Sequence, residues 1–201
     1  EMLYLDFLRH GETSLSHTLR GRTDDALTAK GWAQMRSTIT QSEQTGQAWD
    51  VIYSSPLQRC RLFAEEWAEQ KQLPLYIEPN LQEMDFGEWE AQPTERLYQL
   101  YPDELAQFWQ TPLSFTPPQA ESLLAFKSRV LESVETLTQQ KHKQGWQRAL
   151  IIYHGGVIKL LKCQALKQND NDLLKMSAEL GQLTRFVFDQ GQLQFIQSED
   201  V

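Results

Sequence analysis

The chain has 201 residues, 40% of them hydrophobic, which is enough to bury a sizeable core. Its formal net charge is −8, from 19 basic and 27 acidic residues with the four histidines neutral, so it lacks the basic surface that a general nucleic-acid binder needs. No apolar run approaches the roughly 18 residues of a membrane-spanning helix, and no signal-peptide pattern opens the sequence. We therefore expect neither nucleic acid nor membrane as a partner.

The chain carries two cysteines, Cys60 and Cys163. They have neither C-x-x-C nor zinc-finger spacing, and two cysteines in a chain of this length do not make a disulfide framework. Because a reducing compartment suits such residues, we predict a cytoplasmic location.

Predicted strands and helices alternate along most of the chain. Thr28 is a predicted N-cap, and Ser55-Pro56 opens another helix with a capping hydroxyl followed by a proline at the first helical position. In chain order, we predict a strand at 3–8, a helix at 28–40, a strand at 51–54, a helix at 55–70, a strand at 75–78, helices at 94–110 and 120–143, a strand at 149–153, a helix at 157–166, and a hairpin of strands at 184–189 and 192–197.

This alternation predicts an α/β fold: a three-layer α/β/α sandwich around a mostly parallel sheet, with the closing hairpin as an antiparallel element. The segment ALIIY, at 149–153, is a continuous apolar run typical of a strand buried on both faces. No Gly/Ser-rich, acidic or Pro-rich tract divides the chain, so we predict a single domain over residues 1–201. The pattern does not give the order of the strands.

Cationic or imidazole side chains follow three of the predicted strands. Arg9 and His10 come directly after the first, Arg59 lies one turn past the second, and His154 follows ALIIY. If these strands are parallel, the residues share the sheet edge at which open α/β folds bind ligands. Each also has an ordinary explanation. Histidines are frequent in loops, and Arg59, where the helix dipole disfavours a cation, is balanced either by a protein carboxylate or by a bound phosphate.

Together these side chains suit a phosphoryl group. A guanidinium group binds two phosphate oxygens at once, and a neutral imidazole can attack phosphorus and carry the phosphoryl group covalently. Gly155-Gly156, at the start of a helix, lets backbone N–H groups approach an anion closely. Glu83, in the loop after the third strand, is the best-placed carboxylate to protonate a leaving oxygen.

Other catalytic arrangements have less support in the sequence. Neither cysteine begins a C-x5-R loop, and the G-x-S-x-G, G-x-x-x-x-G-K-[ST] and H-E-x-x-H motifs are absent. A metal site is an alternative in which a cation is bound by His10, His17, Glu12 and Asp24. Arg9 beside His10 would repel a divalent ion, so we predict no metal at this site.

The sequence resembles the histidine phosphatase superfamily, also called the phosphoglycerate mutase-like family. The resemblance extends over most of the chain in ordered blocks: LRHGET at 8–13, GRTDDALTAKG at 21–31 with Gln34, SSPLQR at 54–59, LQEMDFGEWE at 81–90 with Glu121-Ser122 downstream, and HGG at 154–156. It implies the phosphoglycerate mutase-like fold and a reaction through phosphohistidine without a cofactor.

The resemblance also implies a role for each matching residue. His10 would be the nucleophile, and Glu83 the general acid that later activates water. Arg9, Arg59 and His154 would be catalytic through stabilisation of the charge on the phosphoryl oxygens. The full predicted phosphate-binding set is Arg9, Ser16, Gly21, Arg59, His154 and Gly155.

Several positions depart from the family pattern without removing a predicted catalytic group. They are Ser16 in place of a frequent Asn, Ala26 in place of Pro, Ala91 in place of Gly, and Gln119-Ala120 in place of Gly-Gly. A serine hydroxyl at position 16 can still donate to phosphate.

The resemblance favours a phosphatase over a mutase, because mutases of the family carry longer insertions that shield phosphohistidine from water. Within the phosphatases, DFGEWE, Phe108-Trp109 and the Pro-rich approach to Glu121-Ser122 resemble the α-ribazole phosphatases of cobalamin nucleotide-loop assembly. A phosphatase of sugar phosphates or phosphoglycerates is the alternative within the superfamily. A binding module for phosphorylated ligands without catalytic activity is the alternative from another class.

The expected partner is a small phosphorylated metabolite. The sequence leaves open whether the protein is a monomer or a homodimer. It also leaves open whether three aromatic residues pack the core or stack on a substrate base: Trp89, Phe108 and Trp109.

Overall fold

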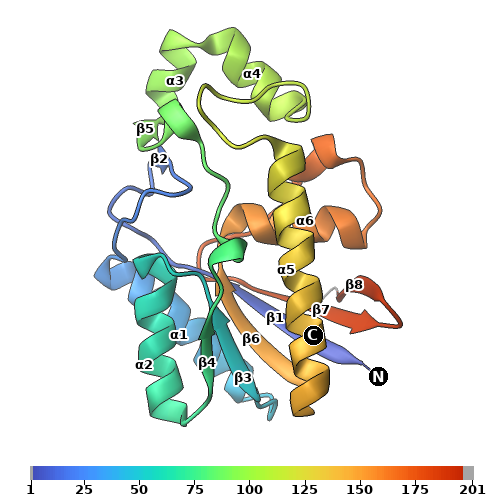
Figure 1. Ribbon diagram of the computed structural model, residues 1–201. Helices are drawn as coiled ribbons and strands as arrows, with labels where there is room; N and C mark the ends of the chain where they lie inside the picture. Colours follow the sequence, from blue (N-terminus) through green and yellow to red (C-terminus); the bar gives the residue numbers. More distant parts are fainter. Residues whose placement is uncertain (1, 197–201) are drawn as a thin grey trace.

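The computed structural model describes residues 2–196, which form a six-stranded sheet between two layers of helices (Figure 1). The strand order is β4-β3-β6-β1-β7-β8. The strands are β1 Leu3–Arg9, β3 Val51–Ser54, β4 Leu75–Ile77, β6 Arg148–Tyr153, β7 Leu183–Asp189 and β8 Gln192–Ile196. The first four are parallel, and β7 and β8 pair in antiparallel fashion. The predicted parallel sheet with an antiparallel hairpin is confirmed; Gln197, at its predicted end, lies outside the described residues.

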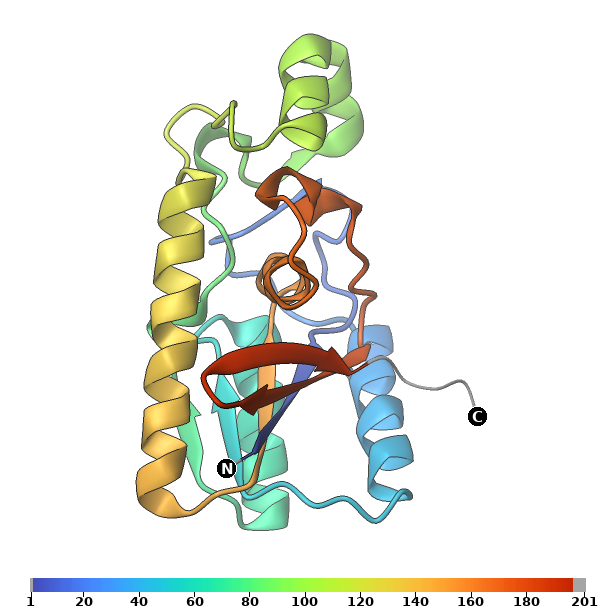
Figure 2. The same ribbon diagram turned by 90° about the vertical axis from the view of Figure 1, so that its right-hand side faces the viewer.

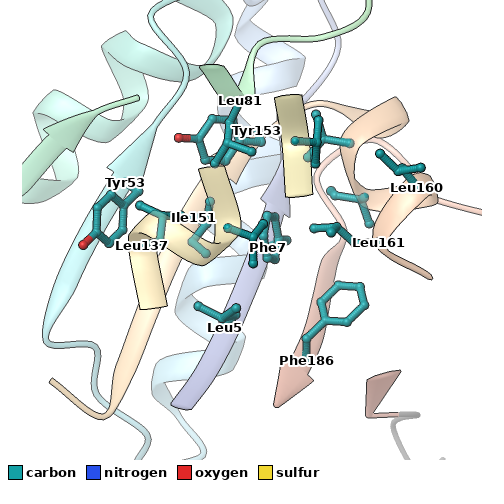
Figure 3. Packing of buried hydrophobic residues seen from close by; sticks show 14 of the residues in the cluster. Leu5, Phe7, Tyr53, Leu81, Leu137, Ile151, Tyr153, Leu160, Leu161 and Phe186 are labelled. Atoms are coloured by element: carbon teal, nitrogen blue, oxygen red, sulfur yellow. The ribbon is translucent and has the colours of Figure 1, made fainter. Parts of the chain in front are cut away.

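Helices cover both faces of the sheet, so the predicted three layers are confirmed. Helices α1 (Ala29–Glu43) and α2 (Gln58–Lys71) pack on one face, and α5 (Leu123–Gln144) and α6 (Gly155–Ala165) on the other. Successive residues of β6 alternate between the two cores, since Leu150 packs with α1 and α2 and Ile151 with α5 and α6. Figure 3 shows the second core, where strand residues such as Phe7 and Ile151 meet Leu137 and Leu161.

Three helix starts differ from the prediction, and one of them is that of α6, which begins at Gly155 and not at 157. The Thr28 hydroxyl caps α1 as predicted, accepting from the Gly31 N–H at 3.1 Å. Helix α2, however, begins at Gln58, and the Ser55 hydroxyl accepts from the Leu57 N–H instead of capping a helix at Pro56. Helix α5 begins at Leu123, because the hydroxyl of Ser122 accepts from the N–H of Ala125 and so caps the helix later than the predicted start at 120.

The prediction of one helix over 94–110 is wrong. The segment forms α3 (Thr94–Leu100) and α4 (Pro102–Gln110), which are separated at Tyr101. Pro102 has no N–H to donate and restricts the residue before it, so it ends one helix and starts the next.

The sequence also did not predict several short elements beyond the carboxyl edge of the sheet. They are the pair of strands β2 (Thr18–Leu19) and β5 (Gln92–Pro93) and the 3-10 helices η1 (Pro79–Leu81), η2 (Gly87–Trp89) and η3 (Asp170–Lys175). Figures 1 and 2 show α3 and α4 at the top of the molecule, above α6 and η3. Among the described residues, no helix is both long and apolar enough to cross a bilayer.

Candidate active site

The predicted cationic and imidazole residues meet at the carboxyl edge of the parallel strands. Arg9 ends β1, His10 follows it, and His154 follows β6, whose Tyr153 is the register partner of Arg9. Arg59 lies at the start of α2, after β3. The rings of His10 and His154 are 5.5 Å apart between centroids, and both residues are buried. The prediction that these residues share one edge is confirmed.

His10 is held in one orientation by the backbone. Its Nδ1 lies 2.8 Å from the carbonyl oxygen of Gly11, which can only accept, so a neutral ring carries its proton on Nδ1 and leaves the lone pair on Nε2. Burial, and then the charges of Arg59 and Arg9, hold the pKa of His10 well below its usual value. His10 therefore stays neutral at pH 7 with a nucleophilic Nε2.

His154 has the complementary arrangement. Its Nε2 lies 2.8 Å from the hydroxyl oxygen of Ser55, which already accepts from the Leu57 N–H. In the tautomer that carries the imidazole proton on Nδ1, Ser55 donates its proton to Nε2. Within residues 2–196 this buried Nδ1 has no hydrogen-bond partner. Burial, and then the charge of Arg59, hold the pKa of His154 well below its usual value.

Cys60 lies beneath this histidine, with its sulfur 3.8 Å from His154 Nε2. Burial raises the pKa of the Cys60 thiol to about 12, so it is an unreactive thiol at neutral pH.

Arg59 is fully buried and has a protein carboxylate as its partner. Its guanidinium group donates to Asp25 Oδ1 at 3.2 Å, to the carbonyl of Gly21 at 2.7 Å, and to the carbonyl of Thr23. The carboxylate explanation for this arginine is therefore present in the structure. Its Nε nevertheless has no partner among the described residues, and the same holds for the Nε of Arg9.

Gly21 was predicted to bind phosphate, and the structure gives it a different position. Its N–H donates to both carboxylate oxygens of Glu90, at 3.0 Å, and its carbonyl accepts from Arg59. With its one donor occupied, Gly21 supports Arg59 and does not offer an N–H to an anion. Glycine is required here because an added Cβ would lie 1.6 Å from the carbonyl oxygen of Met84.

Glu90 is the residue that organises this loop, and the sequence did not single it out. Its carboxylate accepts from the backbone N–H groups of Gly21, Arg22, Thr23 and Phe86 and from the Thr23 hydroxyl. Although burial opposes ionisation, these hydrogen bonds lower the pKa of Glu90 overall. Glu90 thus connects the loop that holds Arg59 to the loop that carries Glu83.

Glu83 lies at the N-terminus of α6. Its Oε2 accepts from the Gly156 N–H at 2.8 Å, and its Oε1 from the Met84 N–H at 3.0 Å. The Glu83 main-chain carbonyl is held by the side chains of Arg22 and Arg129. The sequence predicted that the Gly155-Gly156 backbone approaches a bound anion, but in the structure the Gly156 N–H donates to the Glu83 carboxylate.

Ser16 and Gly155 also lie at the site. Ser16 Oγ accepts from the Thr13 N–H at 2.8 Å, and its side chain borders the cavity described below. Gly155 is the first residue of α6, and a Cβ added to it would lie 2.9 Å from Arg9 Nε. The close approach of backbone and guanidinium therefore depends on glycine at this position.

A cavity of about 250 Å³ opens beside Arg9 and Glu83. Two cationic residues that the sequence analysis did not assign, Arg20 and Lys159, also line it. The remainder of the lining is mainly apolar and includes Phe86, Phe108, Trp109, Leu123, Phe126 and Leu174.

Of the three aromatic residues whose role the sequence left open, two line the cavity and one lies only in the core. Trp109 lines the cavity and is 37% exposed, so it can contact a ligand. Phe108 is buried, and it both lines the cavity and packs in a small core beneath α3 and α4. Trp89 belongs to that small core and is not among the residues that line the cavity.

The alternative metal site is not assembled. Glu12 accepts from the Thr28 hydroxyl, and Asp24 accepts from the Gln58 N–H. In the described part of the chain, no three His, Cys, Asp or Glu side chains are grouped as metal ligands.

Residues 5–201 match the histidine phosphatase superfamily (branch 1), and the chain belongs to this family. It is a phosphatase of the phosphoglycerate mutase-like fold.

Individual members of the family are similar to this chain over most of its length. The chain is 31% identical over 159 residues to the adenosylcobalamin/alpha-ribazole phosphatase of Escherichia coli K12, which covers 77% of this chain and 74% of that protein. It is 27% identical over 186 residues to a 2,3-bisphosphoglycerate-dependent phosphoglycerate mutase of Bartonella henselae, covering 88% of each. The solved structure of a putative alpha-ribazole-5'-P phosphatase from Escherichia coli K-12 superimposes with a TM-score of 0.83 at 26% identity, over 96% of this chain and 94% of that one.

Proposed function

We propose that the protein hydrolyses phosphate monoesters without a metal ion, through a phosphohistidine formed on His10. The observation that carries this proposal is the contact between His10 Nδ1 and the Gly11 carbonyl, because it fixes the tautomer whose Nε2 can attack phosphorus. Arg9 and Arg59, whose charges act on His10, and the neighbouring His154 would donate to the phosphoryl oxygens.

In the first step, His10 Nε2 forms a bond to phosphorus while the bond from phosphorus to the ester oxygen breaks. Glu83, protonated at this stage, gives its proton to the departing oxygen, so the product leaves as a neutral alcohol. The surrounding guanidinium groups and His154 stabilise the charge that the transferring phosphoryl group carries.

In the second step, a water molecule replaces the alcohol. The Glu83 carboxylate takes a proton from this water as its oxygen attacks phosphorus and the P–N bond breaks. Inorganic phosphate leaves, and His10 returns to its neutral form with Glu83 protonated again. One carboxylate thus acts as acid and then as base, which its fixed position at the Gly156 N–H supports.

We further propose α-ribazole 5′-phosphate as the substrate. Similarity to the Escherichia coli adenosylcobalamin/alpha-ribazole phosphatase supports this assignment. The apolar and aromatic lining of the cavity next to Glu83 supports it as well, since Trp109 and Phe108 offer surfaces on which a benzimidazole base can pack. The protein would act in the cytoplasm, where its two buried free cysteines need no oxidising environment.

A phosphorylated sugar or sugar acid is the second candidate substrate. The observation that favours it is Lys159, an ammonium group on the wall of an otherwise mainly apolar part of the cavity. Burial lowers the pKa of Lys159, and a carboxylate on the substrate would compensate that burial.

The two substrates are separated by steady-state kinetics on α-ribazole 5′-phosphate, 3-phosphoglycerate and a sugar phosphate, each with and without a chelator. We expect the highest kcat/KM for α-ribazole 5′-phosphate and no effect of the chelator. A Trp109→Ala variant should lose activity on α-ribazole 5′-phosphate while keeping its activity on the smaller substrates. A preference for 3-phosphoglycerate that disappears in Lys159→Met would assign the second substrate class instead.

A further inference from the structure

Arg20 is a buried cation on the wall of the active-site cavity. It follows β2, lines the cavity together with Arg9 and Glu83, and its side chain is only 7% exposed. Its Nε lies 3.2 Å from Asp25 Oδ2. Within residues 2–196, however, neither its Nε nor its Nη2 makes a hydrogen bond of acceptable geometry.

Such an arginine is unusual as a purely structural residue, because buried guanidinium groups normally satisfy their donors. Arg129 shows the ordinary case. It donates to both oxygens of Glu121 and to the carbonyls of Asn80, Gln82 and Glu83. Arg20 has a single ion pair and donors left over at the cavity.

The unpaired donors of Arg20 are part of a larger pattern around His10. Arg9 Nε, Arg59 Nε and His154 Nδ1 are also buried and without a hydrogen-bond partner among the described residues. Three guanidinium groups whose charges act on His10, and the imidazole beside it, therefore carry nitrogen atoms with no partner among the described residues. An anion with several acceptor oxygens satisfies all of them at once.

Charge balance points the same way. Asp25 faces Arg59 with Oδ1 and Arg20 with Oδ2, so one carboxylate orients two guanidinium groups. Arg9, Arg20 and Arg59 outnumber Asp25, their carboxylate neighbour, and Lys159 adds a further cation to the cavity wall, so the site favours an anion. The charge of Arg20 also reaches the reacting groups, since it helps to lower the pKa of both His10 and His154.

We propose that Arg20 binds the transferred phosphoryl group as a third guanidinium and thereby makes the site selective for the dianionic form of a phosphate monoester. This inference rests on the proposed function, because it assigns Arg20 to the same phosphoryl transfer. Arg20 donates to phosphoryl oxygens in the Michaelis complex, in the transition state and in the complex with product phosphate.

The test compares Arg20→Gln and Arg20→Lys with the wild type and with Arg36→Gln. Arg36 is a matched control, since it is an exposed arginine paired with Glu66 on the surface. Measured are kcat/KM for p-nitrophenyl phosphate and the inhibition constant of inorganic phosphate. For Arg20→Gln we expect kcat/KM to fall and the inhibition constant to rise, each by roughly 10- to 100-fold, as for loss of a charge-assisted hydrogen bond. For Arg20→Lys, kcat/KM and the inhibition constant should lie between those of the wild type and of Arg20→Gln. Arg36→Gln should match the wild type in both.

Two further readouts separate phosphate binding from a structural role. Free guanidinium ion should restore part of the activity of Arg20→Ala, as only a lost guanidinium contact can be replaced in this way. The pH profile of kcat/KM in the wild type should rise through the second ionisation of the substrate phosphate, and this rise should flatten in Arg20→Gln. If Arg20→Gln does not fold, the phosphate inhibition constant and the pH profile of Arg20→Lys are compared with those of the wild type instead.

The proposal is overturned if the inhibition constant of phosphate is unchanged in Arg20→Gln and Arg20→Lys, whether or not their thermal stability falls. That outcome leaves the proposed function intact, provided that the wild type still hydrolyses the ester and His10→Ala does not. If His10→Ala and Arg20→Gln both keep the hydrolysis rate of the wild type, the proposed function itself is rejected.

Discussion

Replacing Gly156 with alanine should disable the general acid without altering its chemistry. An added Cβ would lie 2.2 Å from Glu83 Oε1 and 3.0 Å from Oε2, whereas ordinary contact begins near 3.4 Å. The carboxylate must therefore move by about 1.2 Å, the difference between 3.4 and 2.2 Å, and its hydrogen bond from the Gly156 N–H is strained or lost.

A shift of this size is large for a proton donor, since a misplacement of about 1 Å can cost roughly 100-fold in rate. We expect kcat/KM of Gly156→Ala to fall by roughly 100-fold on an alkyl phosphate, whose leaving group needs a proton. On p-nitrophenyl phosphate, whose leaving group needs little help, the loss should be several-fold at most.

The assay is kcat/KM across a series of phosphate esters with leaving groups of increasing pKa, for the wild type, Gly156→Ala, Glu83→Gln and the double variant. Because both substitutions act on the same proton transfer, the double variant should be little worse than Glu83→Gln alone. An equal loss on good and poor leaving groups, or fully additive losses in the double variant, would refute the argument that Gly156 acts through Glu83.

Three further predictions concern stability and the loop that carries Glu83. The folded pKa of His10 and of His154 lies below the unfolded value near 6.5, so below pH 6.5 the unfolded chain binds more protons than the folded chain. The free energy of unfolding should therefore fall by up to about 1.4 kcal/mol per pH unit per histidine below pH 6.5. Between pH 6.5 and 5, urea unfolding of His154→Asn should show a smaller fall than that of the wild type, and equal falls would contradict this. Ala91 has a φ of +59°, so Ala91→Gly should raise the free energy of unfolding by about 0.5–1 kcal/mol, and an unchanged melting temperature would count against it. Arg129→Met removes the ion pair with Glu121 and the hydrogen bond to the Glu83 carbonyl. We expect kcat/KM to fall roughly tenfold on alkyl phosphates and less on p-nitrophenyl phosphate. Losses of the same size on both substrates would show that this hydrogen bond does not position the acid.

The features that the sequence predicted well are those with a local pattern. The apolar runs that become β1, β3 and β6 place their carboxyl ends, and therefore Arg9, His10 and His154, at one edge of the sheet. The break of the predicted helix at Pro102 had a local signal as well, because proline excludes a continuous helix there.

The features that it missed depend on contacts between residues far apart in the chain. Glu90 binds the loop at Gly21, 69 positions away, and Glu83 binds Gly156, 73 positions away. Arg20 has no motif of its own and is recognisable only when its burial and its pairing with Asp25 are seen. The family departure at Ala91 likewise gains a physical meaning only from the positive φ that the structure gives it.

The central claim is that His10 carries the phosphoryl group during turnover. The most direct measurement is rapid quenching of the enzyme with a ³²P-labelled monoester, followed by mapping of the labelled residue and its stability to acid and base. We predict an acid-labile, base-stable label on His10 that forms at the rate of alcohol release and is absent from His10→Ala. Undiminished turnover by His10→Ala, or a label on another residue, would contradict the account.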